Sequence, residues 1–217
     1  MYIDDTETII IKIIQILDYE EKWWKTEELS QMLGISKSTV QKYIRDLKFH
    51  IEEDLKLVEQ FQILAAASKG VILKRIGKVN IGIQSLVTKI YDHSLVYSIV
   101  EELLNENGET VISLSLKKYA SVASIRRCFS KMNAYFSEHD LKIEKLCLNG
   151  PELNARSFFF SYYWEITRGI IWPFHSIRKE TILKLITIIE DRFGFKYSLM
   201  AKEEMCFLFA ISRIRYK

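Results

Sequence analysis

Apolar residues recur every three or four positions along most of the chain, a spacing that predicts amphipathic helices. Residues 5–19 carry a broad apolar stripe and form the first predicted helix. Residues 26–33 follow as a short helix, and after a tight turn at Gly34 a longer helix covers 37–53, with Ser36 as its cap. The buried line of this longer helix consists of Val40, Ile44, Leu47 and Ile51.

A β-hairpin follows the three helices. Residues 61–67 and 71–76 predict its two strands, and Ser68-Lys69-Gly70 forms the turn, with glycine at the position that needs a positive φ. The order helix, short helix, turn, long helix, hairpin is typical of a winged helix-turn-helix domain, in which the hairpin is the wing.

The chain then repeats itself at a shift of 85 residues without a gap. The shift places Leu29-Ser30 on Leu114-Ser115, Ser36 on Ser121, Thr39 on Ser124, Val40 on Ile125, Gln41-Lys42 on Arg126-Arg127, Ile44 on Phe129 and Leu47 on Met132. Caps, buried positions and cationic positions all coincide. Because this period is the size of a small domain and too long for a solenoid repeat, the sequence predicts a duplicated winged helix-turn-helix.

Helices predicted over 81–91 and 94–105 connect the two units. In the second unit, residues 141–148 alternate as a strand, Asn149-Gly150 is a hairpin-turn dipeptide, and a helix over 151–167 follows. These features predict a small wing in the second unit as well.

The remaining residues form two more predicted helices, over 176–192 and from 201 to the last residue. The last helix is amphipathic to the end of the chain, so we expect that the chain is a fragment or that a following domain is missing. The aromatic run over 158–164 is expected to be core or an inter-domain contact. The predicted fold is mainly α with small β-hairpin wings, in three parts: tandem winged helix-turn-helix domains over 1–80 and 81–167, and a partial all-helical domain over 168–217.

Catalytic and metal-binding patterns are missing from the sequence. It contains no phosphate-binding loop, zinc-protease motif, nucleophile elbow or dinucleotide-binding motif. The four histidines are scattered, and the three cysteines form no C-x-x-C pair, which suits reduced thiols in a cytoplasm. The chain begins with acidic residues where a signal peptide would be basic, and its apolar stretch over 9–17 is too short to cross a membrane. We therefore expect a cytoplasmic, non-enzymatic protein with no cofactor, no metal and no membrane contact.

The long helix of each unit has a polar outer face. With about 100° per residue, the outward side chains are Ser38, Gln41, Lys42 and Arg45 in the first unit and Ala123, Arg126, Arg127 and Ser130 in the second. A major groove admits one helix, and Arg, Lys, Gln and Ser are the types that read its base edges and phosphates. One such helix is equally well explained as an ordinary amphipathic helix with its cations in water. Two at matching positions, each after a capped short helix, favour DNA.

The formal net charge of +3, from 31 Lys and Arg against 28 Asp and Glu, is too small to indicate a polyanionic partner. The charges are segregated, however. Two windows contain no acid and five cations each: residues 60–91, with Lys69, Lys74, Arg75, Lys78 and Lys89, and residues 110–137, with Lys117, Lys118, Arg126, Arg127 and Lys131. Residues 1–60 carry 8 cations against 13 acids. Basic windows on the helices and wings that are predicted to contact DNA are what phosphate binding requires.

Wings and helix caps are the expected contacts to the DNA backbone. The side chains predicted to lie at phosphates are Ser36, Lys69, Lys74, Ser121 and Lys145. Lysines on a hairpin also protect an edge strand from pairing, so the wing cations alone do not establish DNA binding.

Four motifs stand in order along the chain: ELSQMLGISKSTV at 28–40, SVASIRR at 121–127, NGPELNAR at 149–156, and WPF at 172–174 before LFAI at 208–211. In this order they resemble the amino-terminal part of the Mga/AtxA family of transcription regulators of Gram-positive bacteria, over essentially all 217 residues. The first motif alone is generic to helix-turn-helix proteins, whereas the order of all four is much more specific.

The resemblance implies tandem winged helix-turn-helix domains that bind double-stranded promoter DNA, usually as activators of virulence or carbohydrate-responsive genes. In the family a phosphotransferase-system regulation domain follows, in which histidines can be phosphorylated and dimer contacts are made. The chain from about residue 168 resembles the first helices of that domain. A homodimer and phosphotransferase-system proteins are thus the partners implied for the full-length protein, and with no histidine after His175 no phosphorylation site is carried over.

The second unit departs from the commoner pattern. Tyr119 stands where the first unit has Gly34, and Lys117 and Lys118 lie in its short helix, so its turn geometry is open. Two other functions use the same units: a protein-interaction module, and an RNA-binding antiterminator like those of related regulators. RNA is the weaker option, because winged helices bury little single-stranded stacking surface.

Overall fold

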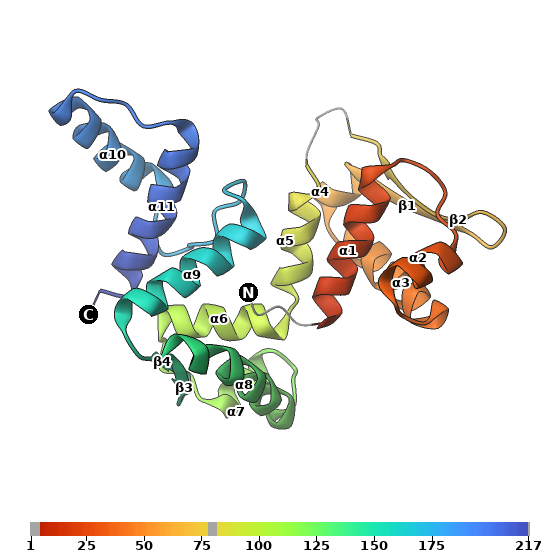
Figure 1. Ribbon diagram of the computed structural model, residues 1–217, viewed down its shortest axis with the longest axis horizontal. Coiled ribbons are helices and arrows are strands. Elements are labelled where there is room, and N and C mark those ends of the chain that lie inside the picture. The colour runs from red at the N-terminus through yellow and green to blue at the C-terminus, as the bar shows by residue number, and fades with distance from the viewer. Residues whose placement is uncertain (1–4, 78–81, 217) are drawn as a thin grey trace. The chain divides into compact units, whose positions relative to one another are not determined.

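The computed structural model describes residues 5–77 and 82–216 (Figure 1). By its contacts the chain divides into two compact units, the first ending at Ser94 and the second beginning at Leu95. In chain order the first unit contains α1 (Asp5–Tyr19), α2 (Thr26–Leu33), α3 (Lys37–Glu52), α4 (Leu55–Val58), β1 (Phe61–Ala66), β2 (Gly70–Arg75) and α5 (Gln84–Asp92). The second contains α6 (Leu95–Asn105), α7 (Val111–Lys117), α8 (Val122–Phe136), η1 (Ser137–His139), β3 (Lys142–Glu144), β4 (Cys147–Asn149), α9 (Glu152–Thr167), α10 (Lys179–Phe193) and α11 (Leu199–Ile214).

The mainly α fold with two small antiparallel hairpins confirms the predicted fold class. The structure adds α4, a single turn that the sequence pattern did not predict. The Asp54 carboxylate caps this turn by accepting the backbone N–H groups of Lys56 and Leu57 at 3.0 and 3.2 Å. None of the described helices is both long enough and apolar enough to cross a membrane.

One apolar core holds the first unit together. Ile13, Leu29 and Leu47, from the first three helices, are fully buried in it. α5 supplies Leu86 and Ile90 to the same core. α5 therefore packs within the first unit, whereas the sequence drew a domain limit at residue 80; residues 78–81 lie outside the described part, and the three domain limits stay a prediction.

The helix-turn-helix of the first unit is fixed by side-chain caps. Gly34 ends α2 in the left-handed conformation, with φ +65°. The Ser30 hydroxyl donates to the Ile35 carbonyl at 2.6 Å, which closes the turn. The Ser36 hydroxyl then accepts the Thr39 N–H at 3.1 Å, as predicted for the cap of α3.

The second unit repeats these bonds 85 residues later. Ser115 donates to the Ala120 carbonyl at 2.5 Å, and Ser121 accepts the Ser124 N–H at 3.0 Å. Tyr119 takes the place of Gly34 with the same left-handed backbone, φ +50°. The duplication therefore extends to individual hydrogen bonds, and the turn geometry that the sequence left open is that of the first unit.

We expect Ser36→Ala and Ser121→Ala each to lower the free energy of unfolding by about 1 kcal/mol, because each removes the acceptor for a free amide at a helix start. Urea unfolding measures this change. Ser130→Ala is the matched control, since this exposed serine lies inside α8 and caps nothing. Equal effects at Ser36 and Ser130 would contradict the assigned cap.

The first wing is widened by the segment before α2. β1 and β2 pair in register from Phe61 opposite Arg75 to Ala66 opposite Gly70. Trp24 adds a third line of pairing, because it exchanges backbone hydrogen bonds of 2.8 and 2.9 Å with Val71. The wing is thus tied to the entrance of the helix-turn-helix.

The second wing differs from its prediction. The sequence predicted one strand over 141–148 and a turn at Asn149-Gly150, but the turn is Lys145-Leu146, whose two residues both have positive φ. This placement pairs Ile143 with Leu148 and buries both. The Leu146 side chain is buried too, so packing offsets the unfavourable backbone of two non-glycine residues.

The aromatic run of α9 forms the core of the second unit, as expected. Phe158, Phe159, Tyr162 and Tyr163 are buried. Trp172 and Phe174 pack against Phe207 of α11, with ring centroids 5.4 and 5.2 Å away. The sequence predicted that α11 would run to the last residue, but it ends at Ile214, and Lys217 lies outside the described part.

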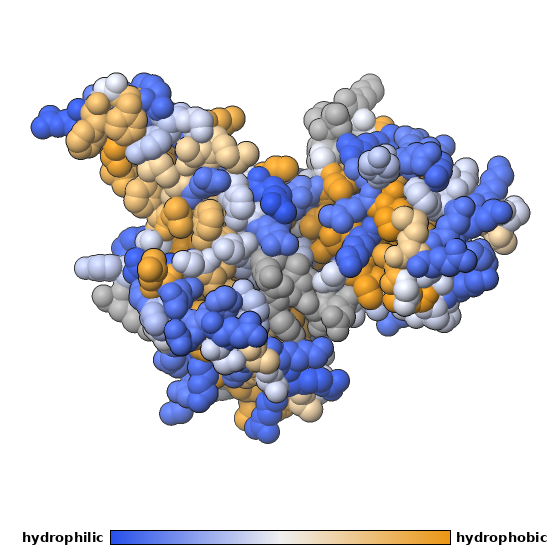
Figure 2. All heavy atoms as spheres, viewed as in Figure 1, coloured by the Kyte–Doolittle hydropathy of each residue, from blue (hydrophilic) through white to orange (hydrophobic). Residues whose placement is uncertain are grey.

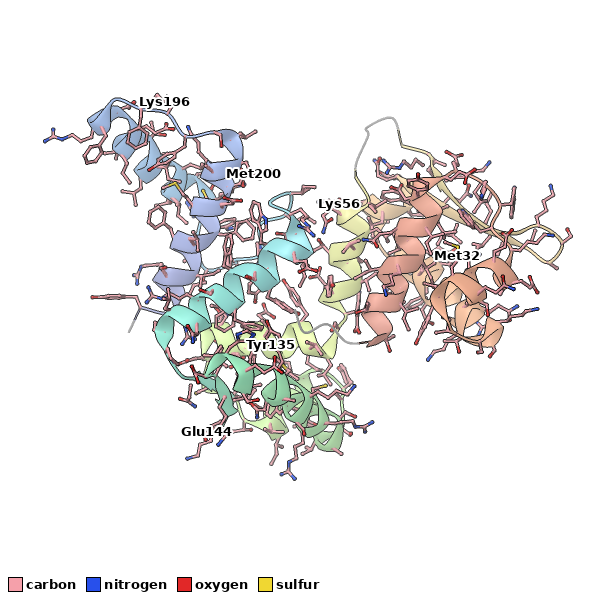
Figure 3. All side chains as sticks on the ribbon, viewed as in Figure 1. Met32, Lys56, Tyr135, Glu144, Lys196 and Met200 are labelled. Carbon is pink, nitrogen blue, oxygen red and sulfur yellow. The ribbon has the colours of Figure 1, made fainter. Side chains whose placement is uncertain are left out.

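α10 and α11 also carry exposed apolar side chains (Figure 2). They are Leu185, Ile188, Phe193, Leu199 and Met200, the last labelled in Figure 3.

Candidate nucleic-acid interface

The predicted recognition face of α3 points to solvent. Ser38, Gln41, Lys42 and Arg45 are exposed, while the opposite line from Val40 to Leu47 is buried. No carboxylate in the described part of the chain pairs with Lys42 or Arg45. Their charges are thus available for a ligand, although contact with DNA itself stays a prediction.

A groove of about 560 Å³ separates α3 from the first wing. Its helical wall carries Gln41 and Arg45, and its other wall is the wing segment 65–68. The starts of α2 and α3 close one end with Lys25, Glu27 and Lys37. The recognition helix and the wing therefore face one shared space, as a reading helix and a backbone-contacting wing require.

Sequence reasoning missed the three charged residues at the end of the groove. Lys37 Nζ lies 2.6 Å from the Glu27 carboxylate, and this hydrogen bond lowers the pKa of Glu27. With Lys25 and Arg45, the groove holds three cations against one carboxylate. The signal available in the sequence was their position at helix starts, since Lys25 and Glu27 lie at the start of α2 and Lys37 begins α3, ten residues after Glu27.

Fewer cations of the basic window over 60–91 are free of carboxylate partners in the structure than the sequence suggests. Arg75 binds Asp18, with Nε 2.9 Å from the carboxylate, and Lys89 lies 3.2 Å from Asp54. Lys78 lies outside the described residues. Lys69 is exposed at the tip of the wing with its Nζ 5.7 Å from the Trp23 ring, and Lys74 is half-buried on β2. Lys69 and Lys74, the two predicted phosphate contacts, are the cations of this window that pair with no carboxylate of the described chain.

The second unit presents the equivalent surface on α8. Ala123, Arg126, Arg127 and Ser130 are all exposed, and neither arginine pairs with a carboxylate in the described ranges. The cap Ser121 is exposed at the start of the same helix.

The second wing is short, and its turn carries Lys145. This lysine is exposed and has φ +50°. Its neighbour Glu144, labelled in Figure 3, pairs with Lys142 at 2.7 Å, and this contact lowers the pKa of Glu144. Lys145 is therefore the cation that the second wing offers to a ligand.

Two family models match these two regions. Residues 79–163 match the Mga helix-turn-helix domain, and residues 10–72 match an HTH domain. The matched ranges contain both recognition helices and both wings, except for the last residues of β2, Leu73–Arg75.

Several regulators are similar to the chain. It is 26% identical over 203 residues to the capsule synthesis positive regulator AcpB of Bacillus anthracis, and the matched region covers 93% of this chain and 40% of that protein. It is 28% identical over 205 residues to the anthrax toxin expression trans-acting positive regulator of the same organism, covering 94% and 41%. A putative trans-acting regulator of Streptococcus pneumoniae is 21% identical over 211 residues, covering 95% and 41%. The chain spans about two fifths of the length of these relatives, and its two matched helix-turn-helix units are consistent with a regulator of the Mga/AtxA family.

Proposed function

We propose that the chain binds double-stranded promoter DNA through both helix-turn-helix units and regulates transcription, without enzymatic activity, in the cytoplasm. The observation that carries this proposal is the pair of exposed cationic faces at matching positions. Lys42 on α3 and Arg127 on α8 are equivalent, 85 residues apart, and each outward face carries a second cation, Arg45 on α3 and Arg126 on α8. The relatives are named positive regulators of capsule synthesis and of anthrax toxin expression, and on that basis we propose activation of virulence genes. Carbohydrate-responsive genes are the alternative that the family resemblance implies.

Each unit is proposed to place its long helix in a major groove. The four cationic side chains read base edges there, together with Ser38, Gln41 and Ser130. The wing lysines Lys69, Lys74 and Lys145 contact phosphates. The starts of α3 and α8, capped by Ser36 and Ser121, point backbone N–H groups at the DNA backbone.

A titration of labelled duplex DNA at two salt concentrations tests this proposal. The duplex is the region upstream of the chain's own gene. We expect affinity to fall steeply with salt, because phosphate contacts release counterions. Salt-independent binding, or no binding, would rule the proposal out. A hairpin RNA titrated in parallel tests the antiterminator alternative, which requires tighter binding to the RNA.

Lys69→Ala and Arg45→Ala are expected to have different effects. Loss of Lys69 weakens binding to every DNA sequence, because one phosphate contact is lost. It also reduces by about 1 the slope of the logarithm of the binding constant against the logarithm of the salt concentration. Loss of Arg45 reduces the binding free energy by about 1–3 kcal/mol on the cognate site only, because a base contact is lost. Lys184→Ala, an exposed lysine on α10, is the control and leaves both quantities unchanged. Identical profiles for the two variants would contradict the assigned roles.

Replacing Arg126 and Arg127 together by alanine separates DNA binding from a protein-interaction module. The proposal requires weaker DNA retardation in this variant, whereas a module that packs on a protein predicts no retardation of DNA even by the unaltered chain. The homodimer and the phosphotransferase-system partners implied for the full-length protein stay proposals.

A further inference from the structure

Two of the chain's four histidines meet in the first unit. His50 lies in the last turn of α3, and His93 follows α5 as its C-cap. Their ring centroids are 4.8 Å apart, and the ring planes are inclined by 33°. Two imidazoles that are far apart in the sequence thus form a contact between α3 and α5. Because an imidazole gains its charge between about pH 5 and 8, such a contact can respond to pH.

The surroundings of His50 favour a neutral ring. Its Nδ1 atom is buried and has no hydrogen-bond partner in the described part of the chain. A protonated imidazole carries an N–H group on both nitrogens, so a proton on His50 leaves a buried, charged donor without an acceptor. Burying such a donor unpaired is costly. Burial, and after it the charge that His93 can carry, lowers the pKa of His50.

Charged groups of α3 and α5 also act on His50. Asp46 on α3 and Glu53, the C-cap of α3, favour a proton on the ring, whereas Lys89 on α5 opposes one. Neither acid forms an ion pair with His50 in the described ranges, and the pKa of His50 is lowered in spite of them. The Lys89 ammonium lies 3.2 Å from the carboxylate of Asp54, the N-cap of α4. The neutral ring is therefore the form that this site accommodates.

The second unit has a different ring at the equivalent position. Tyr135, labelled in Figure 3, stands 85 residues after His50. Its ring centroid lies 4.9 Å from that of His139, which is exposed. A phenol has no basic nitrogen, so this contact never brings two like charges together. The repeated scaffold thus keeps a ring contact at this position that acid does not oppose, and a response to acid is expected of the first unit.

The contact between the two imidazoles adds to the packing of α5. Leu86 and Ile90 of α5 belong to the core of the first unit, and His93 extends this packing to the end of α3. His93 is exposed and can take a proton from solvent, and its charge then faces the half-buried ring of His50. We infer that the His50–His93 contact is acid-sensitive: it holds the end of α3 on α5 while both rings are neutral and weakens when they take up protons.

The direction of the pH effect follows from the protons that each state binds. Histidine in an unfolded chain has a pKa of about 6.5. Because the pKa of His50 is lower in the folded unit, the unfolded chain binds more protons in the interval below that value. The stability that the neutral ring contributes is therefore complete above about pH 6.5 and is lost as the pH falls toward the folded pKa of His50.

Hydrogen exchange followed by mass spectrometry, at about pH 7.5 and at about pH 5.5, tests the inference on the whole chain. After correction for intrinsic exchange rates, the last turns of α3 and α5 are expected to lose about threefold in protection at the lower pH. α11, in the second unit, is expected to keep its protection.

Three variants make the test specific to the histidine pair. His50→Phe keeps a ring against His93 and removes the buried nitrogen, so its α3 and α5 are expected to keep their protection at the lower pH. His50→Gln removes the charge without a larger ring, and it is expected to be equally insensitive to pH even if it is less stable at both values. His175→Gln, which replaces an exposed histidine outside the contact, is the control and responds like the unaltered chain.

Two results would overturn the inference. The first is an equal loss of protection in the unaltered chain and in both His50 variants, which would assign the pH effect to other groups. The second is unchanged protection of α3 and α5 in the unaltered chain at the lower pH, because the contact would then not depend on the charge of its rings. Failure of the unaltered chain to bind duplex DNA would instead count against the proposed function and leave the exchange result standing.

Discussion

Gly70→Ala is expected to lower the free energy of unfolding of the first unit by about 3–5 kcal/mol, through backbone strain and overlap together. Gly70 has φ +99°, a conformation that alanine rarely adopts. A Cβ there would also overlap the Trp24 carbonyl oxygen and lie 2.7 Å from its carbon. Because these are backbone atoms, the strand has to shift, which breaks the two hydrogen bonds between Trp24 and Val71.

Gly34→Ala is the matched control for Gly70→Ala. Gly34 also has positive φ, but a Cβ there meets nothing within 4 Å, so the change costs about 1 kcal/mol of backbone strain alone. Urea unfolding measures both variants, and replacing Trp164 and Trp172 of the second unit by phenylalanine in both leaves Trp23 and Trp24 as the fluorophores of the unit that they affect. Similar losses at the two glycines would show that the close approach to Trp24 does not hold the wing.

The same pair of variants connects the wing to the proposed function. Gly70→Ala displaces the strand that forms one wall of the groove facing Arg45, whereas Gly34 does not line that groove. We therefore expect Gly70→Ala to weaken duplex binding even in conditions where the protein stays folded, and Gly34→Ala to leave it unchanged.

Much of this fold follows from local sequence patterns. The cap Ser36, the glycine at position 34 and the buried line from Val40 to Ile51 predict the helix-turn-helix because each acts within one or two turns of chain. The 85-residue repeat extends the same reasoning to the second unit. The outward positions of both recognition helices follow from helical periodicity, and the structure places all of them in solvent.

The second wing was mispredicted because two signals competed. Asn149-Gly150 is the stronger turn dipeptide, yet the chain turns at Lys145-Leu146, where burial of Leu146 and the pairing of Ile143 with Leu148 outweigh local preference. Burial of this kind depends on the rest of the unit and is invisible in a short window.

Charge availability was only partly predictable for the same reason. Arg75 belongs to an acid-free window, but its partner Asp18 lies 57 residues earlier and reaches it through the fold. Lys37 likewise meets Glu27 across the turn. A window of sequence shows which charges are near in the chain, whereas a ligand meets those that stay unpaired in space.

Arg215→Ala is expected to lower the free energy of unfolding of the second unit by about 1–3 kcal/mol, because it removes a buried guanidinium from an ion pair whose carboxylate, Glu152, is 43% exposed and stays solvated. The Arg215 side chain is only 5% exposed. Its Nε and one terminal nitrogen each donate at 2.9 Å to the two carboxylate oxygens of Glu152, and the guanidinium lies over the Phe159 ring. Its other terminal nitrogen lies 3.5 Å from Glu106. Arg215, the C-cap of α11, thus joins the first turn of α9 to Glu106, the residue after α6.

The pH dependence of unfolding identifies this contact. Hydrogen bonds from Arg215, and then from Arg156, lower the pKa of Glu152. A carboxylate whose pKa is lower in the folded state adds stability above its unfolded pKa, about 4.3, and that stability is lost as the pH falls through the folded value. We expect the unaltered chain to lose more stability below about pH 4.3 than Arg215→Ala does, because the variant keeps only the bond from Arg156.

Two further variants make this prediction specific. Arg213→Ala removes an exposed arginine two residues away and should leave both the stability and its pH dependence unchanged. Arg215→Lys keeps the charge but not the planar pair of donors, so it should recover only part of the lost stability. If Arg215→Ala unfolds like Arg213→Ala at neutral pH, the guanidinium does not hold α11 to α9. If the two variants differ at neutral pH but lose stability equally in acid, Arg215 contributes by packing on Phe159 and not by its charge.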